Sequence, residues 1–446
     1  MTTEKHQYSK QVEQEVLNLR KNIDNHNFQF RGALRQFVNK EQSNKRLDFI
    51  KSKSIDDLDR NIADFEVNFI NRGGKIAWIN SNEDFTLELN KIIKQHVSKK
   101  IAKHKSNIIK EFSYAEELFE RVSNVSISEI VSDKLSNHLV NPLIEADTKN
   151  IHSFLNDKYH IPLTVTENEV SEFLRTEINK IIDNTDISIS EADFLFADNG
   201  SIIISENDGD IGLSISKHKI HIVIAGIDNI FPTIKESEFL LSMLSTYRYG
   251  RKVNTSNFII SGVKQPEESE GIDELYLFLV NNYRTELLAK PEQKKVLNCI
   301  KCGICQNVCP VYKTIGDSKY NAIQTGPIGL LTTPYLDKEK TSILYLCSLC
   351  GKCSNICPAG INIPKLILYD RRDFSNLPEY SRIRTAIKIY RATYLNNWVK
   401  NYCPNRIKKW IKDLLLKKMM RSPNLNDYNN IKLPKKNFNQ IVGKRM

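Results

Sequence analysis

Hydrophobic and polar residues follow a helical period through the first part of the chain, interrupted by one short apolar run. Residues 1–50 are polar with helical spacing and carry no strong strand signal. The stretch IDDLDRNIADFEVNFINRGG (55–74) predicts a helix that stops at its two glycines, because glycine readily ends a helix. The run KIAWI (75–79) predicts a strand, and EDFTLELNKIIKQHV (83–97) predicts the next helix.

The same alternation resumes further along the chain. ENEVSEFLRTEINKII (167–182) has helical spacing, and a strand-rich run follows: ADFLFADNGSIIISEND (192–208), KIHIVIAGI (219–227) and DELYLFLV (273–280). Strands that alternate with helices predict an α/β domain over residues 51–290, with a largely parallel sheet covered on both faces. We expect Lys290-Pro291 to be a hinge into a mainly helical, cysteine-bearing segment, residues 291–375.

The last part of the chain, residues 376–446, is predicted to be a basic helical tail. Within it, RIKKWIKDLLLKKMMR (406–421) places apolar residues on one helix side and Lys and Arg on the other, with a single acid. Such a helix can lie on an anionic membrane, dock on its own domain or bind a partner. The pattern alone leaves these three alternatives open.

Composition narrows the class of protein further. A chain of 446 residues has room for two or three domains. Its net charge of +11 comes from Lys and Arg scattered among many acids, which argues against a nucleic-acid-binding patch. The polar amino end has no secretory h-region, and no apolar run approaches the roughly 20 residues that span a bilayer. We therefore expect a cytoplasmic protein, with peripheral contact at the inner membrane face as one role for residues 406–421.

The cysteines carry the clearest chemical signal. Eight of the nine lie between Cys299 and Cys357, and the ninth is Cys403. In a reducing compartment such a cluster is more typical of a metal site than of disulfides. The eight form two copies of C-x-x-C-x-x-C-x-x-x-C-P, the bacterial ferredoxin pattern for [4Fe–4S] clusters: Cys299, Cys302, Cys305, Cys309 and Cys347, Cys350, Cys353, Cys357.

In this pattern the fourth cysteine usually binds the cluster of the other motif. We therefore expect one cluster on Cys299, Cys302, Cys305 and Cys357, and a second on Cys347, Cys350, Cys353 and Cys309. This exchange would hold two clusters close enough for electron tunnelling. Zinc is the alternative, but a zinc site needs four ligands rather than eight at this spacing. Cys403 has no partner motif and is expected to be an ordinary thiol.

Residues around the cysteines resemble one protein family. The segments CPVYKTIG (309–316) and TGPIGLLTTP (325–334), together with the upstream NIADFEVNFINRGGKIAW (61–78) and IHIVIAGIDNIFPT (220–233), are similar to the lactate-utilisation iron–sulfur proteins. These form the B subunit family of a three-component bacterial L-lactate oxidation system. The resemblance covers roughly residues 30–370.

The resemblance implies an upstream fold similar to ribose-5-phosphate isomerase and the CoA transferases. It also implies an electron-transfer subunit that receives electrons as L-lactate becomes pyruvate, with no catalytic residue of its own. Its partners would be two companion subunits, one cysteine-rich and one with a second lactate-utilisation domain. Two alternatives stay open: a subunit for another 2-hydroxy acid such as glycolate or for quinone reduction, and a redox-sensing regulator that binds a small acid.

Three other features are candidates for a role. His221, on an apolar run, is either a catalytic base or a hydrogen-bonded core residue. Lys105-Ser106 stands where the family has a Lys-Ser pair, which suggests a phosphate or carboxylate contact. The loop SENDGDIG (205–212) is either an ion-binding turn or a hairpin loop. The sequence contains no GxGxxG or P-loop, so we expect any hydride acceptor to be bound by a partner.

Overall fold

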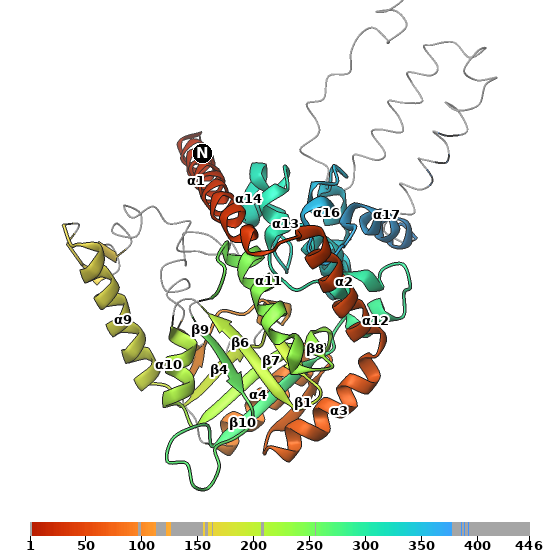
Figure 1. Ribbon diagram of the computed structural model, residues 1–446. Coiled ribbons are helices and arrows are strands. Elements are labelled where there is room, and N and C mark those ends of the chain that lie inside the picture. The colour runs from red at the N-terminus through yellow and green to blue at the C-terminus, as the bar shows by residue number, and fades with distance from the viewer. Residues whose placement is uncertain are drawn as a thin grey trace, which may run out of the picture. The chain divides into compact units, whose positions relative to one another are not determined.

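Figure 1 shows the computed structural model of the chain. It describes residues 2–96, 100–112, 122–125, 155–156, 159–162, 164–206, 209–254, 256–376, and the single residues 385, 388 and 391. The predicted basic helix at 406–421 and Cys403 lie outside these residues. Residues 1–369 form one compact unit and residues 370–446 a second. Within the described part, no helix is both long enough and apolar enough to cross a membrane.

The chain begins with helices, as its polar period predicts. They are α1 (Thr2–Ala33), η1 (Leu34–Gln36), α2 (Lys40–Asp56) and α3 (Leu58–Asn71), followed by strand β1 (Lys75–Ile79) and α4 (Asn82–Gln95). The helix stop predicted at the glycine pair is confirmed. Gly73 has a φ of 82°, and the amides of both glycines hydrogen-bond to carbonyls in the last turn of α3.

A six-stranded sheet forms the centre of the compact unit. Its remaining strands are β2 (Ile101–Lys103), β3 (Val122–Asn124), β4 (Ile187–Glu191), β7 (Ile220–Gly226) and β10 (Glu274–Val280). The spatial order is β1-β10-β7-β4-β2-β3, and every pair is parallel. The predicted α/β class with a parallel sheet is confirmed.

The central strands are buried on both faces, which explains their continuous apolar runs. On β10, Leu275 and Leu277 pack on one face with Phe65 and Phe69 of α3 and with the second sheet. Tyr276 and Phe278 point to the opposite face, where Phe85, Leu89, Ile92 and Ile93 of α4 cover them. Successive side chains of the strand thus contribute to two hydrophobic cores, one on each face of the sheet.

A second, smaller sheet packs beside the first. It contains β5 (Phe194–Phe196), β6 (Ser201–Glu206), β8 (Ile230–Phe231) and β9 (Ser256–Ile260) in the order β8-β5-β6-β9. The helical elements of this region are η2 (Ile109–Glu111), α9 (Glu167–Asp183), α10 (Asp210–Lys217), η3 (Ile227–Asn229), η4 (Ile234–Glu236) and α11 (Ser237–Tyr249). Figure 1 shows α11 and the small sheet in green in front of the larger sheet.

The hairpin interpretation of residues 205–212 is wrong. The strand β6 ends at Glu206 and helix α10 begins at Asp210, so the loop joins a strand to a helix. The Glu206 carboxylate accepts hydrogen bonds from the amides of Ile211 (2.8 Å) and Gly212 (2.9 Å). These amides belong to the first turn of α10, where they lack helical partners. The carboxylate therefore caps the helix.

The cysteine segment is mainly helical, as predicted. After α12 (Arg284–Leu288), it comprises η5 (Lys294–Asn298), α13 (Ile304–Val308), α14 (Tyr312–Tyr320), α15 (Gly329–Leu336), η6 (Lys338–Leu346), α16 (Lys352–Ile356) and α17 (Ile363–Phe374). Helix α13 packs against α16, so the two cysteine motifs lie side by side. The N-terminal helices contact the same segment, α1 at α14 and α2 at η5.

Candidate iron–sulfur site

The two cysteine motifs fold alike around their first cysteine. Two residues after it, Lys301 and Leu349 have φ values of 54° and 57°. This left-handed conformation is uncommon for any residue with a side chain. It directs each backbone N–H to the preceding thiol: Lys301 N donates to Cys299 Sγ (3.3 Å) and Leu349 N to Cys347 Sγ (3.4 Å). Such donors stabilise negative charge on sulfur.

The glycines of the two motifs have a matching role. Gly303 (φ 74°) precedes helix α13, and Gly351 (φ 78°) precedes α16. A left-handed residue turns the chain sharply, which glycine does without steric cost. The turn starts a short helix that carries the third cysteine, Cys305 or Cys353. The regular spacing of the cysteines thus produces a loop that encloses a single site.

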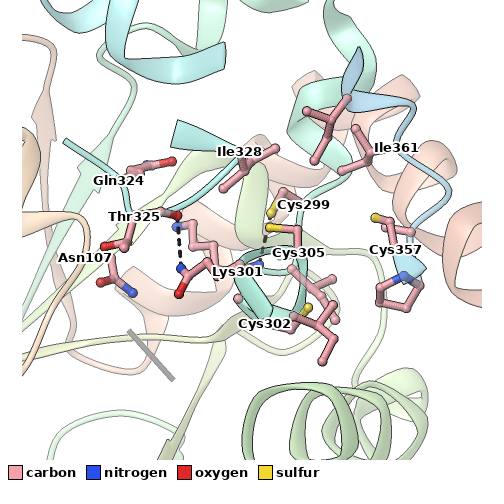
Figure 2. A pocket seen from close by; sticks show the side chains of 17 residues that line it. Asn107, Cys299, Lys301, Cys302, Cys305, Gln324, Thr325, Ile328, Cys357 and Ile361 are labelled. Atoms are coloured by element: carbon pink, nitrogen blue, oxygen red, sulfur yellow. Dashed lines mark hydrogen bonds between the residues drawn. The ribbon is translucent and has the colours of Figure 1, made fainter. Parts of the chain in front are cut away.

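A cavity lies at the centre of the first loop. Its lining includes Cys299, Cys302 and Cys305 from the first motif and Cys357 from the second, the four residues expected for one cluster. Figure 2 shows Cys299, Cys302 and Cys305 near the centre of the view and Cys357 farther to the right. Apolar side chains fill much of the remaining wall: Ile300, Ile304, Ile328, Ile361 and Ile363. The structure thus brings the last cysteine of one motif to the other motif.

The chemistry of these thiols suits a metal cluster. Burial raises the pKa of Cys302 and Cys305 well above the usual range, and neighbouring sulfurs raise both further. Burial also raises the pKa of Cys357 to about 11. A free thiol of this kind is protonated at neutral pH, so a positive metal centre must displace the proton. Four thiols around one apolar cavity fit an iron–sulfur cluster, whose charge supplies that driving force.

No three His, Cys, Asp or Glu side chains in the described ranges converge closely enough to hold a single metal ion.

The remaining four cysteines form a second group. Burial, followed by the sulfurs of Cys347, Cys309 and Cys350, raises the pKa of Cys353 to about 12. Cys309 from the first motif therefore lies among the sulfurs of the second. Its Sγ accepts a hydrogen bond from the amide of Tyr312 (3.5 Å). The two groups are close to each other, because the sulfur of Cys353 contributes to the raised pKa of Cys305.

The polar wall of the first cavity involves residues that the sequence did not single out. Lys301 lines this wall, and its Nζ lies 3.7 Å from Glu191 Oε1. Glu191 is the last residue of β4, at the carboxyl edge of the parallel sheet. Its other oxygen accepts hydrogen bonds from Ser106 Oγ (2.8 Å) and Ile108 N (3.1 Å). The Ser106 hydroxyl, proposed to contact an anion, thus already binds a carboxylate of the protein.

A buried charge network lies at the same edge of the sheet. Arg284 donates to both carboxylate oxygens of Glu111 (3.0 Å each) and also to Asp228. Burial lowers the pKa of Lys51 to about 8, and its ammonium donates to the backbone carbonyl of Asp228. Burial would raise the pKa of Asp228, but Arg284, Lys301 and Lys51 outweigh it and lower that pKa to about 2. The sequence offered one signal for this network, an acidic residue (Asp228) that closely follows the apolar strand β7.

Two N-terminal helices contact the cysteine segment, and one of them, α2, also carries Lys51 of this network. Asn298, one residue before the first cysteine, donates to Asp48 Oδ1 (3.1 Å) and Ser52 Oγ (2.8 Å) of α2. His26 of α1 accepts a hydrogen bond from Asn307 Nδ2 (2.8 Å) on α13. These contacts cover the first motif with protein.

His221 is a core residue, in line with the second interpretation of its sequence position. Its two ring nitrogens hydrogen-bond to Ser188 Oγ and Ser190 Oγ, both on β4. Burial lowers its pKa to about 3, so the imidazole is neutral at physiological pH. With both nitrogens engaged inside the sheet, the ring has no access to a substrate.

Comparison with known proteins agrees with this arrangement. The LUD domain family matches residues 62–278, and the 4Fe–4S dicluster domain family matches residues 295–361. Together they correspond to the α/β region and to the paired cysteine motifs. The chain is therefore similar to the LUD domain family over its α/β region and to the 4Fe–4S dicluster domain family over its paired cysteine motifs.

Curated relatives make the relationship more specific. The chain is 29% identical to lactate utilization protein B of Bacillus velezensis over 311 residues, which cover 68% of this chain and 65% of the relative. It is also 29% identical to lactate utilization protein B of Bacillus cytotoxicus over 293 residues, which cover 64% and 62%. The chain thus spans less than two thirds of the length of these relatives. The predicted resemblance is confirmed: the chain is similar to the lactate utilization B proteins.

One solved structure is also similar, a DUF162 family protein from Deinococcus radiodurans determined at 1.70 Å resolution. The match covers 50% of this chain and 98% of that chain, with 11% sequence identity and a TM-score of 0.29.

Proposed function

We propose that this protein is the iron–sulfur electron-transfer subunit of a complex that oxidises L-lactate to pyruvate. The observation that carries the proposal is the pairing of the two motifs: Cys357 lines the cavity of the first, while Cys309 lies with the second. Two neighbouring cysteine groups, each of which includes the fourth cysteine of the other motif, suit an electron relay better than a single structural metal site. The names of the curated relatives supply the link to lactate.

The proposed cofactors are two [4Fe–4S] clusters. The first is held by Cys299, Cys302, Cys305 and Cys357, and the second by Cys347, Cys350, Cys353 and Cys309. Such clusters accept and release single electrons. The protein contributes thiolate ligands, backbone donors at Lys301 and Leu349, and an apolar wall that limits access of water to the first cluster.

Oxidation of lactate releases two electrons and two protons, and the clusters of this chain carry the electrons one at a time. The hydride or proton acceptor belongs to a companion subunit in this proposal. The companions are a cysteine-rich subunit and a second subunit with a LUD-type domain. We place the complex in the cytoplasm, with residues 406–421 as its contact with the inner face of the membrane.

The test uses the anaerobically purified protein, with and without its companion subunits. Addition of L-lactate to the complete set should bleach the visible absorbance of the clusters, as dithionite does. The isolated chain should respond to dithionite alone. Bleaching by glycolate instead of L-lactate would favour the other 2-hydroxy-acid function. Clusters that dithionite reduces but that no acid reduces in the complete set would contradict the proposal and favour a redox sensor.

A further inference from the structure

The two cysteine motifs share a backbone geometry but differ in what surrounds them. Leu297 and Tyr345 each stand two residues before the first cysteine of their motif, yet Leu297 is 2% exposed and Tyr345 is 56% exposed. Ile304 and Lys352 each follow the left-handed glycine, and Ile304 is 1% exposed whereas Lys352 faces solvent. Equivalent positions therefore lie inside the protein in one motif and at its surface in the other.

The cysteines follow the same division. Cys302, the second cysteine of the first motif, is buried, whereas its counterpart Cys350 is exposed. Helices α1 and α2 contact the segment around the first motif through His26 and Asp48. The group formed by Cys347, Cys350, Cys353 and Cys309 thus reaches the surface at Cys350. Because electron tunnelling weakens steeply with distance, this second group is the one through which an external redox centre can exchange electrons.

The surface at this point is apolar with a cationic border. Leu349, which precedes Cys350 in the chain, is exposed, and so is Tyr345, two residues before the first cysteine of this motif. Residues 341–369 contain no Asp or Glu but include two lysines, Lys352 and Lys365, both exposed. Ser354 Oγ of α16 hydrogen-bonds to Asn362 Oδ1 (3.5 Å), which joins the helix of Lys352 to the first turn of α17, where Lys365 lies. We name the surface formed by Tyr345, Leu349, Cys350, Lys352 and Lys365 the exit face.

We propose that the exit face is the docking surface for a redox protein that surrounds its own centre with apolar and acidic side chains. One electron passes from the reduced second cluster to the partner's centre, which oxidises the cluster by one electron and breaks no bond. Acidic side chains of the partner would pair with Lys352 and Lys365, while Tyr345 and Leu349 supply an apolar contact that excludes water. The proposal rests on the proposed electron-transfer role but does not depend on lactate as the donor.

Charge distinguishes this partner from two other occupants. A second copy of the chain, related by a two-fold axis, would bring the same lysines against each other. The C-terminal stretch 406–421 carries seven Lys or Arg and one Asp in its sequence RIKKWIKDLLLKKMMR, so it would also be repelled. An acidic redox protein is the occupant that complements the face.

The first experiment measures electron transfer from the full-length, dithionite-reduced protein to oxidised flavodoxin, an acidic one-electron acceptor, by stopped-flow absorbance. Lys365→Glu should lower the second-order rate constant about three- to fivefold at low ionic strength, and high salt should abolish the difference. The matched control is Lys94→Glu on the exposed side of α4, which should leave the rate constant nearly unchanged. An equal effect of the two variants would overturn the proposal.

A second pair of variants tests the apolar contact. Tyr345→Ser should slow transfer about fivefold, whereas Leu87→Ser, which removes an exposed apolar side chain from α4, should not. Iron content and dithionite-bleached absorbance must match the parent protein in every variant, which separates loss of docking from loss of clusters. Equal rates for Tyr345→Ser and the parent protein would overturn the apolar contact. Since dithionite supplies the electrons, failure of lactate oxidation would leave both tests intact.

Photo-crosslinking then identifies the occupant. With p-benzoylphenylalanine in place of Tyr345, the full-length protein should crosslink to flavodoxin. Crosslinks that form instead to residues 377–446 or to a second copy would overturn the proposal in favour of those occupants.

Discussion

Arg284 and Glu111, 173 positions apart in the chain, form a two-pronged ion pair in which both side chains are fully buried. The same guanidinium also binds Asp228, so one cation compensates two carboxylates. Asp228 lies two residues after the end of β7, and Gln324 of the cysteine segment donates to Glu111 Oε1 (2.8 Å). This ion pair therefore connects the LUD-type sheet to the cluster-binding segment.

Removal of this cation should be severely destabilising. Arg284→Met would leave Glu111 and Asp228 buried with too little positive charge nearby, and we expect a loss of about 3–5 kcal/mol in the free energy of unfolding. The control is Arg60→Met on α3, whose ion pair with Asp64 is largely exposed and should contribute less than about 1 kcal/mol. Denaturant unfolding followed by circular dichroism measures both. Similar losses in the free energy of unfolding of the two variants would show that the buried ion pair stabilises the protein no more than the exposed one.

The exchange of the fourth cysteine between motifs can be tested by combining substitutions. Cys309→Ser with Cys347→Ser removes two ligands of the same proposed cluster, so about half of the iron and sulfide should remain. Cys309→Ser with Cys299→Ser removes one ligand from each cluster, so little of either cluster should remain. The reverse result would assign each motif its own cluster. Cys403→Ser is the control and should retain the full iron content.

Charge next to the first cavity should tune its cluster. Lys301 lies beside that cavity with a side chain that is 12% exposed, so water screens its charge weakly. Lys301→Gln should lower the reduction potential of the first cluster by on the order of 50 mV, which corresponds to about 1 kcal/mol for one electron. Lys352→Gln, at the surface, should shift the second cluster less, because solvent screens that charge. Redox titration monitored by electron paramagnetic resonance distinguishes the two shifts.

His221 should make the protein sensitive to acid. Its pKa is about 3 in the folded state, below the ordinary value of 6.5 that the unfolded chain adopts. Between these values the unfolded state binds more protons, so the free energy of unfolding falls as the pH drops below about 6.5. The slope from this group approaches about 1.4 kcal/mol per pH unit.

His221→Gln should therefore flatten the dependence of stability on pH between about 4 and 6.5, although it lowers stability at pH 7 through lost contacts with Ser188 and Ser190. Denaturant unfolding at a series of pH values gives the slope. The exposed His160 provides the control, and His160→Asn should keep the slope of the parent protein. An unchanged slope in His221→Gln would mean that other groups govern the acid response.

Much of the local structure follows from neighbouring residues and was predictable. The strands KIAWI, KIHIVIAGI and DELYLFLV appear as β1, β7 and β10, because a short continuous run of β-branched, aromatic and other apolar residues favours a strand wherever it is buried. Strand-rich flanks favour a hairpin at 205–212, and that alternative is wrong. Instead, Gly209 and Asp210 begin helix α10, and the carboxylate of Glu206 caps its first turn.

The sequence by itself determined the long helices, the strands β1, β7 and β10 and the two cysteine motifs, because each depends on residues a few positions apart. The tertiary structure decided which strands are neighbours, how Glu191 reaches Lys301 and how Arg284 reaches Glu111, since these contacts join distant segments. It also decided that two nearly identical motifs differ in exposure. Burial depends on what packs above a loop, and α1 and α2 lie over the first motif while Cys350 of the second faces solvent.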